Sequence, residues 1–517
     1  MQARAGRQRR VWLAVSLAAV IALQVASTWG RLGAPFLDAR LHYSYDNADF
    51  GFKIRNGIRN SDLRSQFGVT VNTYDRWGER TGQPGYYTDH PFLLKALLQL
   101  YGRVAGVSEW TTRSFYLLVA IATAAGFYWI LVQTTGNLFS SAAGAATLVT
   151  LPLFAVYQIC VKFEADGMLL AVWIFVVFIA YLRQGTRVIR LLYAVLVVAA
   201  FLTHWTAILF VGCLGAYQLL LARRLPRARE LVRTTVLASA AGFIAVLALM
   251  SYLQHGSAGA MEPLTRAFAV RAASIPFSVW IDRQLIYLKK NFTAPMALAC
   301  LAMLWLFVSH LWKSRPVSGT AHDPPDQEDL NLLAGFIAVT SAVACIWVAM
   351  FQQGSFIHVY WQYWFCLPIG ALVAGAMTLA EKRWRTPWIW RVLACGLVVW
   401  LFLSAQQTHR GIVADQLGTP ADIEFLRSLR SDHFERLVFV PVTDTRLTQW
   451  FKGPLFPYYT DRHIAVADQP DEVHRGDKLL VLRYKQRPIV VRHIEQWSGV
   501  QLANEKCGLR MCAYDAR

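Results

Sequence analysis

The stretch Arg4–Trp29, RAGRQRR followed by VWLAVSLAAVIALQVASTW, decides the fold class of this chain. Its apolar part begins at Val11 and is long enough to cross the roughly 30 Å hydrocarbon core of a bilayer as a helix. This run is too long for the apolar region of a signal peptide, and it lacks a clear small-residue cleavage site. We therefore predict an uncleaved first membrane span whose basic end lies in the cytoplasm.

The composition extends this prediction to the whole chain. Hydrophobic residues make up 55% of the 517 residues and charged residues only 16%, which is more apolar than soluble globular proteins usually are. Ten further apolar segments, each near the length of a helical span, cover 114–132, 138–159, 167–182, 189–203, 206–222, 234–252, 293–312, 331–351, 362–380 and 389–405. The sequence thus predicts a polytopic α-helical membrane protein with about eleven transmembrane helices.

The charge distribution predicts the topology. The chain carries 51 Lys and Arg against 32 Asp and Glu, and its cations lie beside the apolar segments, so a membrane surface explains them better than a nucleic-acid partner. Every second loop is basic, whereas the short turns between those loops, FEAD, LTHW and QQGSFIH, contain no Lys or Arg. The basic loops are 183–190, 222–233, 312–315 and 381–385. We expect a multi-pass plasma (inner) membrane protein with a cytoplasmic N-terminus.

We predict two domains. Because the number of predicted spans is odd and the N-terminus is predicted to be cytoplasmic, the region after the last span is expected outside the membrane. Residues 1–405 form the transmembrane domain, which includes a catalytic outer loop at 30–112 and a second outer loop at 253–292. Residues 406–517 form a small extracytoplasmic α/β domain with a helix at 419–432. Its strands are expected at 437–442, 478–484 and 488–494. Cys507 and Cys512 lie in this domain, and whether they form a disulfide or stay two reduced thiols remains open.

Three acidic segments lie at the predicted outer surface. In YSYDNADFGFKIRNGIR, at 43–59, Asp46 and Asp49 are three residues apart and share a face of a short helix. The segment YYTDHPFLLK at 86–95 precedes an amphipathic run, and KFEADGM at 162–168 falls in a very short turn between two spans. Acidic residues at this position have either a functional role or only the role of keeping a loop solvated.

The order and spacing of these motifs, DNADFGF, then DHPFLLK, then FEADGMLLA, resemble the membrane glycosyltransferases of the GT-C class. The resemblance is closest to the protein O-mannosyltransferase and aminoarabinose transferase branch, glycosyltransferase family 39, and covers about the first 185 residues. Two departures stand out: Asn47 replaces the usual Glu, which leaves Asp46 in place, and Phe92 replaces the second proline of an H-P-P motif.

The resemblance implies sugar transfer from a polyprenyl-phosphate-linked donor to a lipid, glycan or protein acceptor at the outer face, usually with inversion. It assigns the general base to Asp46 and a second acidic role to Asp166, and it suggests that Asp49, Asp89 and Glu164 orient the acceptor or the sugar. Groups that would bind the donor phosphate or lipid are Lys53, Arg55, His90, Lys95, Arg113, Lys162, His358, Tyr360 and Tyr363. The cations equally suit lipid-headgroup anchors, and the tyrosines equally suit an interfacial aromatic belt.

No cofactor is firmly implied. A divalent cation would be held by Asp46 and Asp166 if these two carboxylates converge, whereas no H-x-x-H or C-x-x-C spacing supports a zinc site at His90 or His204. Two other functions stay open: a transporter of lipid-linked sugars and a non-enzymatic membrane scaffold. The polar groups gather at outer turns rather than inside the spans, which favours the glycosyltransferase.

Overall fold

The computed structural model describes residues 2–36, 43–59, 86, 90–253, 265, 268–313, 325–383, 386–414, 419–432, 434, 436–440, 455–461, 464–467, 472–482, 487–508 and 511–517. Contacts divide the chain into two compact units. We call Met1–Arg31, Thr88–Leu94 and Ser114–Arg410 the helical unit. The remainder, Leu32–Tyr87, Lys95–Arg113 and Gly411–Arg517, is called the sheet unit.

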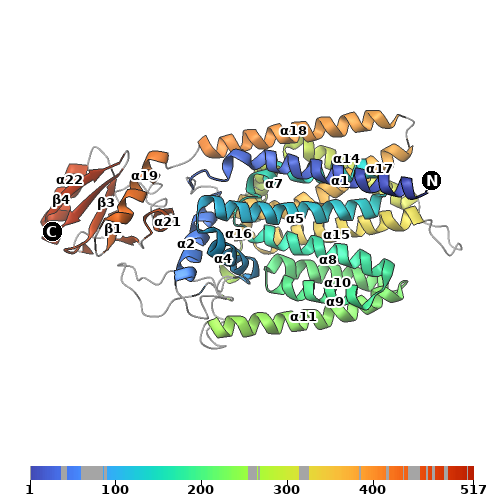
Figure 1. The fold of residues 1–517 in the computed structure, drawn as a ribbon, viewed down its shortest axis with the longest axis horizontal. Helices are drawn as coiled ribbons and strands as arrows, with labels where there is room; N and C mark the ends of the chain where they lie inside the picture. The colour runs from blue at the N-terminus through green and yellow to red at the C-terminus, as the bar shows by residue number, and fades with distance from the viewer. Residues whose placement is uncertain are drawn as a thin grey trace. The chain divides into compact units, whose positions relative to one another are not determined.

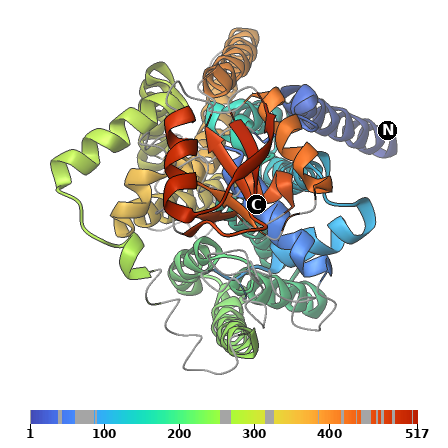
Figure 2. The same ribbon diagram turned by 90° about the vertical axis from the view of Figure 1, so that its left-hand side faces the viewer.

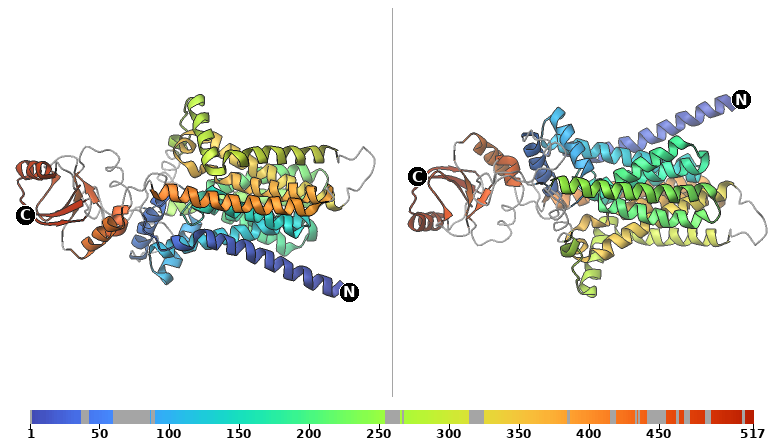
Figure 3. Two further views of the ribbon diagram at one scale, coloured as in Figure 1. Left: turned by 90° about the horizontal axis from the view of Figure 1, so that it is seen from above. Right: turned by 90° about the horizontal axis from the view of Figure 1, so that it is seen from below.

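The helical unit is a bundle of long apolar helices that run side by side (Figures 1 and 3). Its elements are α1 (Gln2–Thr28), η1 (Trp29–Arg31), α5 (Glu109–Thr135), α6 (Leu138–Thr150), α7 (Pro152–Tyr157), α8 (Phe163–Gln184), α9 (Arg187–Phe201), α10 (Trp205–Ala222), α11 (Pro226–Leu253), α13 (Phe277–Phe292), α14 (Ala294–Lys313), α15 (Pro325–Met350), α16 (Gln352–Ile357), η2 (Val359–Phe365), α17 (Cys366–Arg383) and α18 (Pro387–Ala414). The unit boundary falls within α5 and α18, and also within α4 (Leu93–Ala105).

Eight helices in the described part of the chain are long and apolar enough to cross a membrane. The other three predicted spans correspond to α6 with α7, to α9 and to α14. The segment 138–159 breaks into two helices at Pro152, because proline has no amide hydrogen to continue α6. The helix α9 has only 15 residues. The predicted polytopic helical membrane fold is confirmed, with some of its spans shorter than expected.

The sheet unit contains a mixed five-stranded sheet in the order β2-β1-β3-β5-β4. The strands β1 (Leu437–Phe439), β2 (Ile464–Val466) and β3 (Lys478–Leu482) are parallel, while β4 (Leu502–Cys507) and β5 (Met511–Ala516) form an antiparallel hairpin. One face packs on α22 (Arg487–Ser498), and the other packs on α19 (Pro420–Ser428) and α21 (Leu455–Thr460) (Figure 2). Alternate residues of β1, β3 and β5 enter the two cores, as the pleat of a strand requires.

The helix α2 (Tyr45–Arg59) shares one of these cores. Ala48 and Phe52 on α2 are buried with Phe456 on α21 and with Leu480 and Met511 on the sheet. Part of the predicted outer loop 30–112 therefore packs with the C-terminal α/β region in one compact unit.

Two expectations for the C-terminal region have clear outcomes. The helix at 419–432 appears as α19 continued by η3 (Leu429–Ser431), and 437–439 and 478–482 are strands. The strand expected at 488–494 is wrong, because these residues lie in α22. Val491 and Ile494 are three residues apart and pack one helical face onto the sheet. Cys507 and Cys512 form a disulfide across the β4–β5 hairpin.

Candidate active site

In the sheet unit, the acidic pair of α2 lies at the start of that helix. Asp46 is in the first turn and is partly exposed, where the positive end of the helix dipole favours a carboxylate. Asp49 pairs with Lys53, whose Nζ lies 2.5 Å from Oδ2 of Asp49. Burial raises the pKa of Asp49 despite the Lys53 ammonium, and the charge of Asp46 adds to this rise. Burial also raises the pKa of Tyr45 to about 12, helped by both carboxylates.

Two of the predicted phosphate-binding cations converge near these acids. Lys53 Nζ lies 5.0 Å from the centre of the Phe50 ring, and Lys95 Nζ on α4 lies 5.4 Å from it. Lys95 is fully buried, which is unusual for an ammonium unless it has partners. The structure thus brings Asp46, Asp49, Lys53 and Lys95 together around Phe50, and we call these five residues the Phe50 cluster.

Two other predicted cations of the sheet unit have structural partners. Arg55 donates to the Tyr458 carbonyl at 2.9 Å and forms an ion pair with Asp461 at 2.9 Å. Arg113 is buried, donates to the backbone carbonyls of Leu32 and Ala34, and lies 4.6 Å from the Phe36 ring centre. These contacts anchor α2 to α21 and fix the segment 32–36. They do not point to a role in binding phosphate.

In the helical unit, the second acidic turn forms the start of α8. Glu164 and Asp166 lie in the first turn of α8, and both are almost fully buried, at 4% and 1% exposure. Gly167 beside them permits close packing, because a Cβ there would lie 2.3 Å from Oγ1 of Thr206 on α10. Lys162 is the N-cap residue of α8 and is also buried.

Two histidines from different segments stack beside this turn. The His90 ring lies 4.5 Å from Phe163 and 5.3 Å from His204, measured between ring centres. His204 caps α10, since its Nδ1 accepts the backbone N–H of Thr206 at 3.3 Å. Trp347 on α15 meets the edge of His204 at 5.4 Å. The predicted outer turns at 163–166 and 202–205 therefore meet.

The late turn joins the same group. Trp361 stacks on Trp347 at 4.8 Å, and His358 stacks on Trp361 at 5.8 Å. His358 also lies 5.2 Å from Tyr360, whose ring centre is 3.7 Å from Lys162 Nζ. The predicted residues His90, Lys162, His358 and Tyr360 are thus members of one aromatic and cationic cluster. Tyr363 packs separately against Phe154, with ring centres 5.3 Å apart.

The helix α13 holds this late turn in place. Its residues Trp280, Gln284, Tyr287 and Asn291 follow a helical spacing, so they lie on one face. Trp280 donates to Ser355 Oγ, and Gln284, Tyr287 and Asn291 donate to the carbonyls of residues 355, 356 and 359, each at 2.9 Å. Three side chains therefore fix the backbone on both sides of His358, and Trp280 holds the Ser355 side chain. Sequence reasoning missed them, although the spacing of polar and aromatic residues was visible.

A cavity of about 490 Å³ opens beside the histidine stack. Its wall is mainly apolar and includes Ile208, Trp347 and Phe351, and His90 and Arg271 also line it. The buried indole Nε1 of Trp347 has no hydrogen-bond acceptor among the described residues. Arg271 was not among the predicted site residues, because it lies in a long outer loop where a cation has no distinctive sequence signal.

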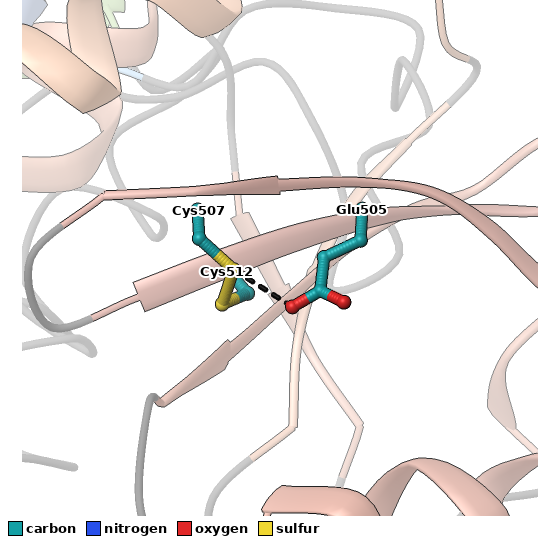
Figure 4. A group of neighbouring side chains, drawn as sticks. All are labelled: Glu505, Cys507 and Cys512. Atoms are coloured by element: carbon teal, nitrogen blue, oxygen red, sulfur yellow. Dashed lines mark hydrogen bonds between the residues drawn. A yellow bond between two sulfur atoms is a disulfide. The ribbon is translucent and has the colours of Figure 1, made fainter.

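Metal binding finds no new support in the described residues. Only Glu505, Cys507 and Cys512 approach one another as three potential ligands there, with the Glu505 carboxylate 2.9 Å from Cys507 Sγ (Figure 4). The two sulfurs are bonded to each other, and a metal ligand must be a thiolate, so this group does not fit a metal ion. Asp46 and Asp166 belong to different units, and their shared cation stays a prediction. Asp89 lies outside the described residues.

Comparison with known proteins identifies the fold. No protein-family model and no curated protein sequence matches the chain. Among solved structures, the chain is similar to ArnT from Cupriavidus metallidurans bound to undecaprenyl phosphate, with a TM-score of 0.56 and 12% identity over 97% of both chains. The apo form of ArnT is similar to the chain with a TM-score of 0.56 and 12% identity over 98% of both chains. The chain is also similar to the oligosaccharyltransferase of Archaeoglobus fulgidus in complex with Zn and sulfate. The TM-score is 0.50 and the identity 11%, over 88% of this chain and 62% of the oligosaccharyltransferase.

Proposed function

We propose that this chain, which has the fold of the GT-C membrane glycosyltransferases, transfers a sugar from a polyprenyl-phosphate-linked donor to an acceptor at the outer face of the membrane. The observation that carries the proposal is the Phe50 cluster, where two ammonium groups lie near one aromatic ring and the partly exposed Asp46 carboxylate acts on Asp49, the partner of Lys53. The similarity to ArnT over 97% of both chains supports it, since that structure holds undecaprenyl phosphate.

Each group of the cluster has a role in this reaction. Asp46 takes the proton from the acceptor hydroxyl or amine as the acceptor atom attacks the anomeric carbon. The bond from that carbon to the phosphate oxygen breaks, and its electron pair leaves with the polyprenyl phosphate. Lys53 and Lys95 balance the charge that develops on this phosphate. Asp49 holds Lys53 in position through its ion pair.

The helical unit offers a second site that suits the donor. An isoprenoid chain is apolar, and the cavity beside His90 has mainly apolar walls. We propose that this cavity binds an isoprenoid chain, while the acidic turn of α8 has a positioning role.

The test is transfer from a panel of radiolabelled polyprenyl-phosphate sugars to endogenous membrane acceptors. Wild type should transfer label, and Asp46→Asn should fold and insert normally but lose transfer. The matched control is Asp282→Asn, which removes an exposed carboxylate from α13 and should keep wild-type activity. Full activity of Asp46→Asn would refute the general-base role. Failure of wild type with every donor would favour the transporter or the scaffold.

A further inference from the structure

A large groove lies between α9 and α11 in the helical unit, far in sequence from the proposed reaction residues. Its volume is about 800 Å³. The chain turns from α8 into α9 at residues 185–186 and from α10 into α11 at residues 223–225. Since α8 to α11 are joined by short turns, α9 and α11 begin at the same end of the bundle, the end that carries the basic loops. The groove starts at this end, near Arg190 and Arg233.

The head of the groove is cationic. Arg190 Nη1 lies 3.3 Å from Glu230 Oε2, and the Tyr181 hydroxyl also donates to Glu230. Arg233 is exposed and forms no ion pair with another residue in the part of the chain that the structure describes. Two guanidinium groups therefore face one carboxylate, and that carboxylate already has two partners. The head of the groove keeps a net positive charge.

The rest of the groove is apolar and follows both helices. Ala194 and Val198 lie one and two turns beyond Arg190 on α9, and Leu237 and Ala241 lie one and two turns beyond Arg233 on α11. Eight residues of helix span about 12 Å, and half of a bilayer core is about 15 Å thick. The apolar part thus matches the depth of a single leaflet, and its alanines leave room for an alkyl chain.

The floor and the far end of the groove are fixed by packing. Behind it, Tyr193 on α9 and Thr235 on α11 are hydrogen-bonded to each other at 2.9 Å and to Gln218 on α10 at 2.6 and 2.8 Å. At the far end, Gly242 on α11 lies so close to Phe201 that a Cβ there would be 2.8 Å from the Phe201 Cβ. The two helices pack closely there, which closes the far end of the groove.

We propose that this groove binds one anionic phospholipid, such as phosphatidylglycerol. The phosphodiester lies against Arg190 and Arg233, and one acyl chain follows Ala194, Val198, Leu237 and Ala241. Guanidinium groups bind phosphate oxygens well, and basic pockets between spans at the cytoplasmic surface select anionic headgroups. A choline headgroup would bring its own cation to the two arginines, so phosphatidylcholine binds less well. The inference does not depend on the reaction proposed above.

The experiment uses the full chain in nanodiscs that contain phosphatidylglycerol and phosphatidylcholine. After extraction in mild detergent, native mass spectrometry measures which lipid stays bound. Wild type should retain one phosphatidylglycerol. The double variant Arg190→Gln/Arg233→Gln should lower the ratio of retained phosphatidylglycerol to phosphatidylcholine by about tenfold. The control Arg223→Gln/Arg224→Gln removes the same amount of charge outside the groove, from the basic loop that also carries Arg233, and should behave as wild type.

A second variant tests the groove without changing its charge. Ala241→Trp fills the apolar part at an exposed position and should also reduce the retained lipid, with an unchanged apparent Tm. Equal retention by the two arginine double variants would overturn the proposal. So would full retention by Ala241→Trp, or wild-type protein that keeps both lipids equally.

Discussion

The two acidic helix starts of this chain look alike in sequence but differ in structure. Both α2 and α8 place carboxylates in their first turn, where the helix dipole favours them. At α2, Asp46 is partly exposed, and its neighbour Asp49 pairs with a lysine. At α8, Glu164 and Asp166 are almost fully buried beside a glycine that packs closely against α10. An acceptor can therefore reach Asp46, the candidate base, more easily than Asp166, for which we propose a positioning role. In the sequence both are simply acidic residues at the start of a helix.

The largest expected effect is a loss of activity, tested by changing one aspartate to asparagine in α2 and one in α8. Asp46→Asn should lower kcat by about 10² to 10⁴, as loss of a general base typically does. Asp166→Asn should lower kcat by less than about tenfold but reduce the apparent Tm, because it changes a buried and close-packed turn. Parallel transfer assays and thermal unfolding of the two proteins would measure both effects. A lower activity of Asp166→Asn than of Asp46→Asn would contradict the assignment of the base to α2 and of the positioning role to α8.

A pair of glycines tests the packing difference. A Cβ at Gly167 would lie 2.3 Å from Thr206 Oγ1 and 3.3 Å from the Ala207 backbone, whereas a Cβ at Gly57 on α2 would lie 2.4 Å from the tip of Gln99. A long side chain can move its end, but a backbone atom moves only with its helix. Gly167→Ala should thus destabilise the protein by about 1–3 kcal/mol. Gly57→Ala should change stability by less than about 1 kcal/mol, since alanine favours the helix. Equal changes in apparent Tm would contradict this difference.

The smallest effect concerns the anchor of α2 on α21. Although burial acts to raise it, Arg59 and Arg55 hold the pKa of Asp461 below its ordinary value. In the unfolded chain the pKa of this carboxyl group is about 4, and above that pH its ion pairs stabilise the fold in full. The stabilisation is lost as the pH falls through the lower pKa of the folded protein. Asp461→Asn should destabilise by at most about 1 kcal/mol at neutral pH, because the pair is partly exposed. Thermal unfolding should show this difference disappearing as the pH falls well below the unfolded pKa of about 4. A constant difference down to that pH would exclude an ionic contribution.

The sequence predicted the membrane fold well because twenty-residue apolar runs and basic loops are local signals. It also predicted the helix at 419–432 and a strand at 478–484, of which 478–482 form β3. The segment 488–494 was assigned wrongly, since a short run of Val and Ile suits a strand or a buried helical face equally, and only the sheet beneath α22 decides. The Arg55–Asp461 pair and the approach of Lys95 to Phe50 join distant residues, and no spacing rule reveals them.

The packing of α2 onto α21 has a consequence for biosynthesis. Arg55 and the carbonyl of Tyr458, to which it donates, are 403 residues apart. At 5–20 residues per second, a ribosome needs roughly 20 to 80 s to make the intervening chain. During that interval the helix that bears Asp46 exists without the core that Ala48 and Phe52 later join. A protein truncated before residue 411 would keep α2 in this immature state permanently, so its inactivity would report on the folding of α2 as much as on acceptor binding.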